Sequence, residues 1–184
     1  MKKGDLLLVT DRQKVYTKGG KWECLNTEGA AENILKIISR KKDDVIFTRF
    51  IADPAAERVW ADYNKKYADV NEDSWSNEMM DEFAPALKKH PLYTKSVYSS
   101  LAVPQVLEAC RKAERVVISG VIAECCVLST VFALIDQGIY TIYLTDAVSG
   151  LDQPKEDGTV LMLKGLSPLH LKIMTTEDYL SEEK

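Results

Sequence analysis

The spacing of the hydrophobic positions changes repeatedly along the chain between two patterns. Short runs of consecutive apolar residues, such as the one in DLLLV at residues 5–9, are typical of strands buried on both faces of a sheet. Longer segments, such as residues 27–42, place apolar residues at helical spacing. The pattern therefore predicts strands that alternate with helices.

Six segments are predicted to be strands, at residues 5–9, 44–50, 92–95, 115–121, 140–147 and 170–176. Five helices are predicted between them, at residues 27–42, 54–68, 103–113, 125–138 and 159–165. Residues 69–90 are polar and irregular, with a short helix expected around SNEMMDEFAPAL, and residues 148–158 are expected to form a loop. Thr27 suits an N-cap, Pro54 a first helical turn and Gly138 a helix C-terminus.

This alternation predicts an α/β fold with three layers, α/β/α, in which helices cover both faces of a mostly parallel six-stranded, Rossmann-like sheet. No repeat, linker or low-complexity segment interrupts the pattern, so we expect one domain over residues 1–184. Ligands of such sheets bind at the carboxyl ends of strands, near the point where the strand order reverses.

The composition of the chain argues against two classes of function, nucleic-acid binding and membrane insertion. The net charge of -4 and the absence of a basic patch argue against nucleic-acid binding. The longest apolar runs are shorter than the roughly 20 residues of a membrane helix, and the N-terminus does not resemble a signal peptide. We expect a soluble, cytoplasmic protein that acts on a small molecule.

The metal-ligating residue types are sparse. His90 and His170 are the only histidines, and the sequence has neither a CxxC motif nor a cluster of carboxylates. The four cysteines, at positions 24, 110, 125 and 126, do not suggest a disulfide framework in a chain of this length. We expect no metal and no other cofactor.

Candidate chemistry lies at the carboxyl ends of three predicted strands, where Asp11, Lys95 and the pair Cys125 and Cys126 occur. Each has an ordinary alternative, as a turn residue, a surface lysine or inert buried thiols. Together these residues suit a cysteine nucleophile that is activated without a histidine. A helix N-terminus and an ammonium group favour a thiolate, and a carboxylate can carry the proton.

Four segments, in order along the chain, resemble motifs of the isochorismatase-like cysteine hydrolases. GVIAECCV (120–127) resembles the signature G-V-x-T-D/E-x-C-V, and LLLVTDRQ (6–13) resembles a first strand that ends in D-x-Q. KSVYSSL (95–101) resembles K-x-x-Y-S-x-F. FALIDQGIYTIYLTDAVSG (132–150) resembles the stretch that follows the cysteine helix. Each motif alone is modest, but the ordered set is specific.

The resemblance implies a catalytic triad of Cys126 as nucleophile, Asp11 as proton carrier and Lys95 as the cation beside the thiolate. It also implies a cis peptide bond between Val121 and Ile122, and an oxyanion hole formed by the N–H groups of Ile122 and Cys126. Cys125 takes a position that the family fills with an apolar residue, so we expect it only to pack. The implied reaction is C–N bond hydrolysis of a small amide or carbamoyl compound through a thioester.

Several positions depart from the family pattern. Members that act on nicotinamide carry an aspartate and two histidines as metal ligands, whereas TRFIADP (48–54) keeps only Asp53. Ala123 replaces the usual threonine, Arg12 replaces an apolar residue and Leu101 replaces an aromatic one. These changes leave the triad intact and put the identity of the substrate in question.

Five residues are candidates for the substrate pocket: Arg49, Phe50, Trp60, Tyr63 and Tyr98. An arginine beside aromatic rings suits a small carboxylated or planar substrate. The alternative is that the aromatic residues pack in a core or subunit contact and the arginine forms a salt bridge. The resemblance also implies a homo-oligomer, a dimer or tetramer, in which a pocket can include residues of a second subunit.

Three functions therefore remain open. The first is the amide hydrolase. The second is an isochorismatase proper, which cleaves a vinyl ether and does not need the cysteine. The third is a ligand-binding member of the fold without turnover.

Overall fold

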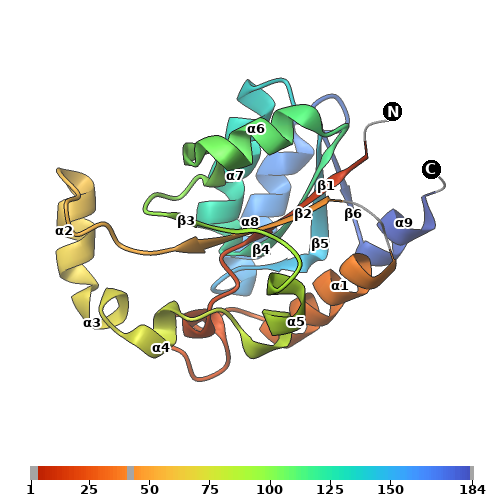
Figure 1. The fold of residues 1–184 in the computed structure, drawn as a ribbon. Coiled ribbons are helices and arrows are strands. Elements are labelled where there is room, and N and C mark those ends of the chain that lie inside the picture. The colour runs from red at the N-terminus through yellow and green to blue at the C-terminus, as the bar shows by residue number, and fades with distance from the viewer. Residues whose placement is uncertain (1–3, 41–43, 183–184) are drawn as a thin grey trace.

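A parallel sheet runs through the centre of the structure (Figure 1). Within residues 4–40 and 44–182, which the computed structural model describes, six strands pair in the order β3-β2-β1-β4-β5-β6. The strands are β1 (Leu6–Thr10), β2 (Asp44–Phe50), β3 (Leu92–Lys95), β4 (Val116–Val121), β5 (Thr141–Ser149) and β6 (Leu171–Met174). The order reverses between β1 and β4, where a ligand site is expected.

Helices cover both faces of this sheet, which gives the predicted three-layer α/β/α fold. The helices are α1 (Thr27–Arg40), α2 (Val59–Lys66), α3 (Ala68–Asn71), α4 (Ser74–Asn77), α5 (Ala84–Leu87), α6 (Pro104–Lys112), α7 (Leu128–Asp136), α8 (Gln153–Lys164) and α9 (Thr176–Ser181). Single helical turns are η1 (Lys14–Tyr16), η2 (Asp81–Phe83), η3 (Ser100–Ala102) and the π-helical η4 (Ala123–Val127). Among the described residues, no helix is both long and apolar enough to cross a bilayer.

The pleat of β1 divides the core into two parts. Leu6 and Leu8 pack with α6, α7 and α8 on one face, and Leu7 and Val9 pack with α1 and α9 on the other. All four side chains are buried, and each contributes about 1.5–3 kcal/mol relative to exposure. This burial on both faces explains why β1 reads as a continuous apolar run rather than an alternating one.

Gly120 permits close contact at the strand reversal. It pairs with Thr10 across β1 and β4 and has a φ of 107°. A Cβ atom at this position would lie 2.0 Å from the carbonyl oxygen of Thr10. The absence of a side chain therefore lets the turn after β4 lie directly beside the end of β1.

Three of the predicted element boundaries are wrong. The helix predicted at 54–68 begins only at Val59, because Asp53 holds residues 53–56 in a turn through hydrogen bonds to Ala55 and Ala56. The loop predicted at 148–158 is instead the end of β5 and the start of α8, whose N-terminus is capped by Asp152. The strand predicted at 170–176 ends at Met174 and is followed by α9, which the pattern did not predict.

The predicted helix ends also differ in detail. The segment predicted at 125–138 begins as the π-helical turn η4 and continues as α7, and Gly138 follows it at a φ of 70°. Thr27 is the first residue of α1 rather than its N-cap, because its hydroxyl donates to the carbonyls of Tyr16 and Cys24. The last residues of the helix predicted at 27–42 lie outside the described residues.

Candidate active site

Asp11, Lys95 and Cys126 meet at the carboxyl edge of the sheet, on both sides of the strand reversal. The Nζ atom of Lys95 lies 2.6 Å from Oδ2 of Asp11 and donates a hydrogen bond to Sγ of Cys126 at 3.4 Å. All three side chains are buried. The structure thus brings together the three residues that the sequence suggested as a triad.

Asp11 is held by Thr48 through two hydrogen bonds. The Thr48 hydroxyl donates to Oδ1 at 3.0 Å, and the N–H of Asp11 donates to the carbonyl of Thr48 at 3.0 Å. Asp11 has a φ of 52°, a left-handed conformation that aspartate adopts more readily than most residues. These contacts leave Oδ2 directed at the ammonium group of Lys95.

Gln13, the last residue of the D-x-Q segment, fixes the neighbouring strand. Its side-chain amide donates to the carbonyl of Phe50 at 2.9 Å and accepts from the N–H of Phe50 at 2.8 Å. This pair of hydrogen bonds ties the loop after β1 to the end of β2. Gln13 therefore positions the strand end that carries Phe50.

Lys95 has three polar neighbours for its three N–H bonds, since its ammonium also donates to the carbonyl of Val97 at 3.0 Å. Burial by itself lowers the pKa of Lys95, but its interactions with the Asp11 carboxylate and with Cys126 more than offset this, so the pKa is raised. Lys95 is therefore a cation at neutral pH, and Asp11 is its counterion.

The thiol of Cys126 is protonated in this arrangement. Burial raises the pKa of Cys126 far above its usual range, and Asp11 raises it further, while Lys95 lowers it. The expectation that a helix N-terminus and a lysine favour the thiolate is thus outweighed by burial and by the nearby carboxylate. Cys126 needs a partner that removes its proton during the reaction, and Asp11, which contacts the same lysine, is the carboxylate placed to do so.

The turn that carries Cys126 is a π-helical segment. The N–H of Val127 donates to the carbonyl of Ile122 at 3.1 Å, a five-residue spacing. The carbonyl of Cys126 accepts from the Thr130 hydroxyl at 2.7 Å, and the peptide bond between Val121 and Ile122 is cis. The nucleophile candidate thus lies just before α7 rather than in its first turn.

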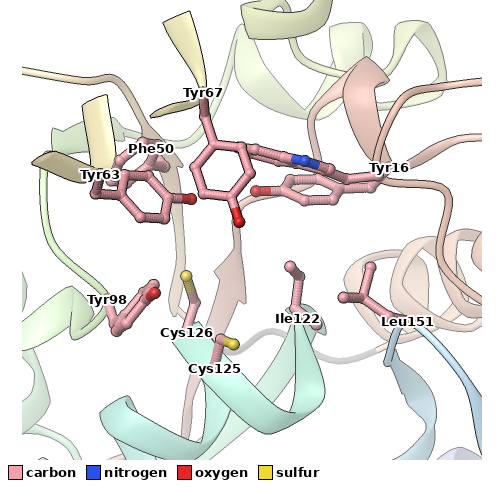
Figure 2. Close-up of a pocket in the computed structure, with 10 residues that line it drawn as sticks. Tyr16, Phe50, Tyr63, Tyr67, Tyr98, Ile122, Cys125, Cys126 and Leu151 are labelled. Atoms are coloured by element: carbon pink, nitrogen blue, oxygen red, sulfur yellow. The ribbon is translucent and has the colours of Figure 1, made fainter. Parts of the chain in front are cut away.

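A cavity of about 150 Å³ lies above Cys126 (Figure 2). Among the residues that the structure describes, its lining is mostly aromatic and includes no charged side chain. The residues that form it are Tyr16, Trp22, Phe50, Tyr63, Tyr67, Tyr98, Ile122, Cys125, Cys126 and Leu151. Figure 2 shows the sulfur of Cys126 pointing into this space, below the rings of Tyr63 and Tyr67.

Four of the five predicted pocket residues belong to this region. Phe50, Tyr63 and Tyr98 line the cavity. Trp60 packs behind them, with its ring centroid 4.9 Å from that of Tyr98 and 6.2 Å from that of Phe50.

Arg49, predicted for the pocket, does not line this cavity. Neighbouring residues of a strand point to opposite faces, so Arg49 faces away from the side on which Phe50 lies. Its Nε atom donates to the Thr94 hydroxyl at 3.0 Å instead. Arg49 therefore gives this cavity no cation, and no other charged side chain lies among the described residues that line it.

Several lining residues were missed. Tyr67 continues the spacing of Trp60 and Tyr63 at three- and four-residue intervals, so helical periodicity could have found it. Tyr16 and Trp22 come from the irregular segment after β1, which has no periodic signal. Cys125, expected only to pack, is half-buried and lines the cavity beside Cys126.

Among residues 4–40 and 44–182, no three histidine, cysteine, aspartate or glutamate side chains lie close enough together to hold a metal ion. Asp53, the remnant of the metal motif, accepts a hydrogen bond from the N–H of Ala55 at 2.9 Å. Its carboxylate thus stabilises a local turn.

Similar folds occur among solved structures. A cysteine hydrolase from Pseudomonas syringae has a TM-score of 0.79 at 20% identity, and the match covers 96% of this chain and 90% of that one. An isochorismatase-like hydrolase from Alkaliphilus metalliredigens has a TM-score of 0.75 at 16% identity, with coverages of 96% and 97%. A pyrazinamidase/nicotinamidase from Streptococcus mutans has a TM-score of 0.71 at 18% identity, with coverages of 93% and 100%.

These identities are low, so the structural likeness establishes the fold alone. A comparison with curated proteins found no match. The sequence itself matches the family model of the isochorismatase domain over residues 5–178, nearly its whole length. This chain belongs to the isochorismatase family.

Proposed function

We propose that this chain is a hydrolase that cleaves the C–N bond of a small amide or carbamoyl compound, with Cys126 as nucleophile. The supporting observation is that Lys95 contacts both Asp11 and Cys126 directly beneath a small cavity. A nucleophile, a proton carrier and a fixed cation are the parts that thiol-based acyl transfer requires.

In the first step, the sulfur of Cys126 attacks the substrate carbonyl carbon and the thiol proton passes to Asp11. Because the pKa of Cys126 is raised by burial, little thiolate exists beforehand, and proton transfer accompanies attack. The ammonium group of Lys95 stabilises the negative charge that develops on sulfur. The N–H groups of Ile122 and Cys126 are proposed to stabilise the carbonyl oxygen as it becomes an oxyanion.

In the second step, the C–N bond breaks and Asp11 gives its proton to the departing nitrogen, which leaves a thioester on Cys126. A water molecule then attacks the thioester and gives a proton to Asp11. The C–S bond breaks, the acid product leaves, and the proton returns to sulfur. The carboxylate thus alternates between base and acid.

One structural neighbour supports an amide substrate, because the Streptococcus mutans protein is a pyrazinamidase/nicotinamidase. The buried ion pair also supports thiol chemistry over vinyl ether hydrolysis, which does not need Cys126.

Ammonia release from a panel of small primary amides and carbamoyl compounds tests this proposal. We expect turnover of at least one compound, a loss of at least about a thousandfold in Cys126→Ala, and retained turnover in Cys125→Ala. Full activity in Cys126→Ala, or release of pyruvate from isochorismate that does not depend on Cys126, would contradict it.

A further inference from the structure

Six aromatic rings line the cavity above Cys126, and we call them the aromatic cage (Figure 2). They come from four separate segments of the chain: η1 and the loop after it, the end of β2, α2 with the residue that caps its C-terminus, and the loop after β3. The cage consists of Tyr16, Trp22, Phe50, Tyr63, Tyr67 and Tyr98.

The rings of the cage contact one another in a continuous series. The ring centroids of Trp22 and Tyr67 lie 5.5 Å apart, and those of Tyr67 and Tyr63 lie 4.8 Å apart. Tyr16 stacks on Trp22 at 6.1 Å, and Phe50 meets Tyr63 at 6.1 Å. A small group inside the cavity therefore lies near several rings at once.

The electrostatic character of the cage favours positive charge. Ring faces carry partial negative charge, and a cation within about 6 Å of a ring centroid is attracted to them. Figure 2 also shows the hydroxyl groups of Tyr16, Tyr63 and Tyr67 converging over Cys126. No lining residue is charged, and Lys95 beneath the cavity is neutralised by Asp11.

Two rings of the cage already attract ammonium groups of the chain itself. Nζ of Lys95 lies 5.6 Å from the ring centroid of Phe50, below the cavity. Nζ of Lys66 lies 5.1 Å from the ring centroid of Tyr67. A carboxylated substrate, by contrast, would meet no counterion in this lining, since Arg49 faces away.

We propose that the substrate carries a quaternary ammonium or protonated tertiary amine group, held in the aromatic cage and joined by a short linker to the amide carbonyl beside Cys126. This substrate class rests on the proposed hydrolysis. A cavity of this size is comparable to one that holds benzene, so the cationic group must be compact, such as trimethylammonium.

The test compares trimethylglycinamide with tert-butylacetamide, which has the same shape but carries carbon in place of the charged nitrogen. Binding is measured by calorimetry on Cys126→Ala, so that the effect of the charge on amide reactivity does not enter. We expect the cationic amide to bind about tenfold to thirtyfold more tightly. Equal affinity, or tighter binding of the neutral amide, overturns the proposal.

A pair of variants in the Cys126→Ala background tests whether the aromatic cage causes the preference for the cationic amide. Tyr67→Phe keeps the ring and should retain most of the preference, whereas Tyr67→Leu removes the ring and should reduce it severalfold. The affinity for tert-butylacetamide should fall less than the affinity for the cationic amide in Tyr67→Leu, and circular dichroism of each variant controls for folding. A preference that survives Tyr67→Leu unchanged contradicts the proposed role of this ring.

The same compounds separate this proposal from the proposed function. Ammonia release by the unmodified protein that depends on Cys126, together with no charge preference in binding, contradicts only the cationic substrate. A charge preference without ammonia release from any amide supports the cage and contradicts the hydrolysis.

Discussion

The chemistry of the site depends on how three buried groups share charge. Lys95 contacts Asp11 and Cys126 together, so the ion pair is internal and the thiol keeps its proton. A buried charge without its partner is costly, because the interior solvates it poorly. Removal of either member of the pair is therefore expected to affect stability as well as activity.

The Lys95→Met variant should lower the free energy of unfolding by about 3–5 kcal/mol, because it leaves the Asp11 carboxylate buried without a cation. The double variant Asp11→Asn/Lys95→Met removes both charges and should recover most of this loss without restoring turnover. Urea denaturation of the single and double variants measures both effects. A double variant that is less stable than Lys95→Met would show that the pair is not coupled in this way.

At the residue scale, the contact among Asp11, Lys95 and Cys126 was predictable, and the lining of the cavity only in part. Strand ends and ordered motifs indicated Asp11, Lys95 and Cys126 without any three-dimensional information. Arg49 was assigned to the pocket together with Phe50, although adjacent strand residues face opposite sides. Applying that alternation to β2 would have removed Arg49 from the prediction.

At the scale of elements, Thr130 connects the nucleophile turn to the lysine segment. Its hydroxyl donates to the carbonyl of Cys126 at 2.7 Å and accepts from the N–H of Ser100 at 3.0 Å. Ser100 in turn lies 3.3 Å from Thr48 through their hydroxyl oxygens, and Thr48 holds Asp11. One buried hydroxyl thus links α7 and η3, and through η3 reaches β2.

The Thr130→Val variant should lower the free energy of unfolding by about 1–3 kcal/mol, because it leaves the buried N–H of Ser100 without an acceptor. It should also lower kcat more than it changes KM, since the contacts that it removes position the triad. Thr130→Ser keeps the hydroxyl and serves as the matched control. If the valine and serine variants have equal stability and kcat, Thr130 does not have this role.

The helices and strands were predictable where burial of a face requires apolar residues at a regular spacing. All six strands were predicted, because each contributes apolar side chains to a buried sheet. The start of α8 was missed because its first turn is polar and depends on the cap by Asp152. The short helix α9 was missed because its six residues show no clear periodicity and its start depends on the capping box of Thr175 and Asp178.

At the scale of the whole molecule, buried thiols link stability to alkaline pH. Burial raises the pKa of Cys24 and of Cys110 to about 12, from an ordinary value of 9.0. Above pH 9 these thiols ionise in the unfolded chain but remain protonated in the folded protein. The unfolded state then binds fewer protons, so a rise in pH favours unfolding.

The free energy of unfolding should therefore fall between about pH 9 and 12, by about 1.4 kcal/mol per pH unit for each such thiol. Urea denaturation under reducing conditions across this range measures the slope. Cys110→Ala should reduce the slope, whereas Cys125→Ala, which removes a half-buried thiol, should reduce it less. A slope that Cys110→Ala leaves unchanged would contradict this assignment.

The overall architecture follows from features that are visible in the sequence, and the pocket does not. Structures that share only 16–20% identity with this chain have the same fold, because the alternation of buried strands and amphipathic helices determines it. The aromatic cage, by contrast, requires that the loop carrying Tyr16 and Trp22 reach α2, which no periodic pattern encodes.

The identity of the nucleophile is the central claim, and trapping the acyl intermediate tests it most directly. The best amide from the panel is mixed with the protein, the reaction is quenched with acid during turnover, and the peptide that contains Cys125 and Cys126 is fragmented in a mass spectrometer. We predict an acyl group on the sulfur of Cys126, present in Cys125→Ala and absent in Cys126→Ala. An acyl group on Cys125, or undiminished turnover by Cys126→Ala, would contradict the account.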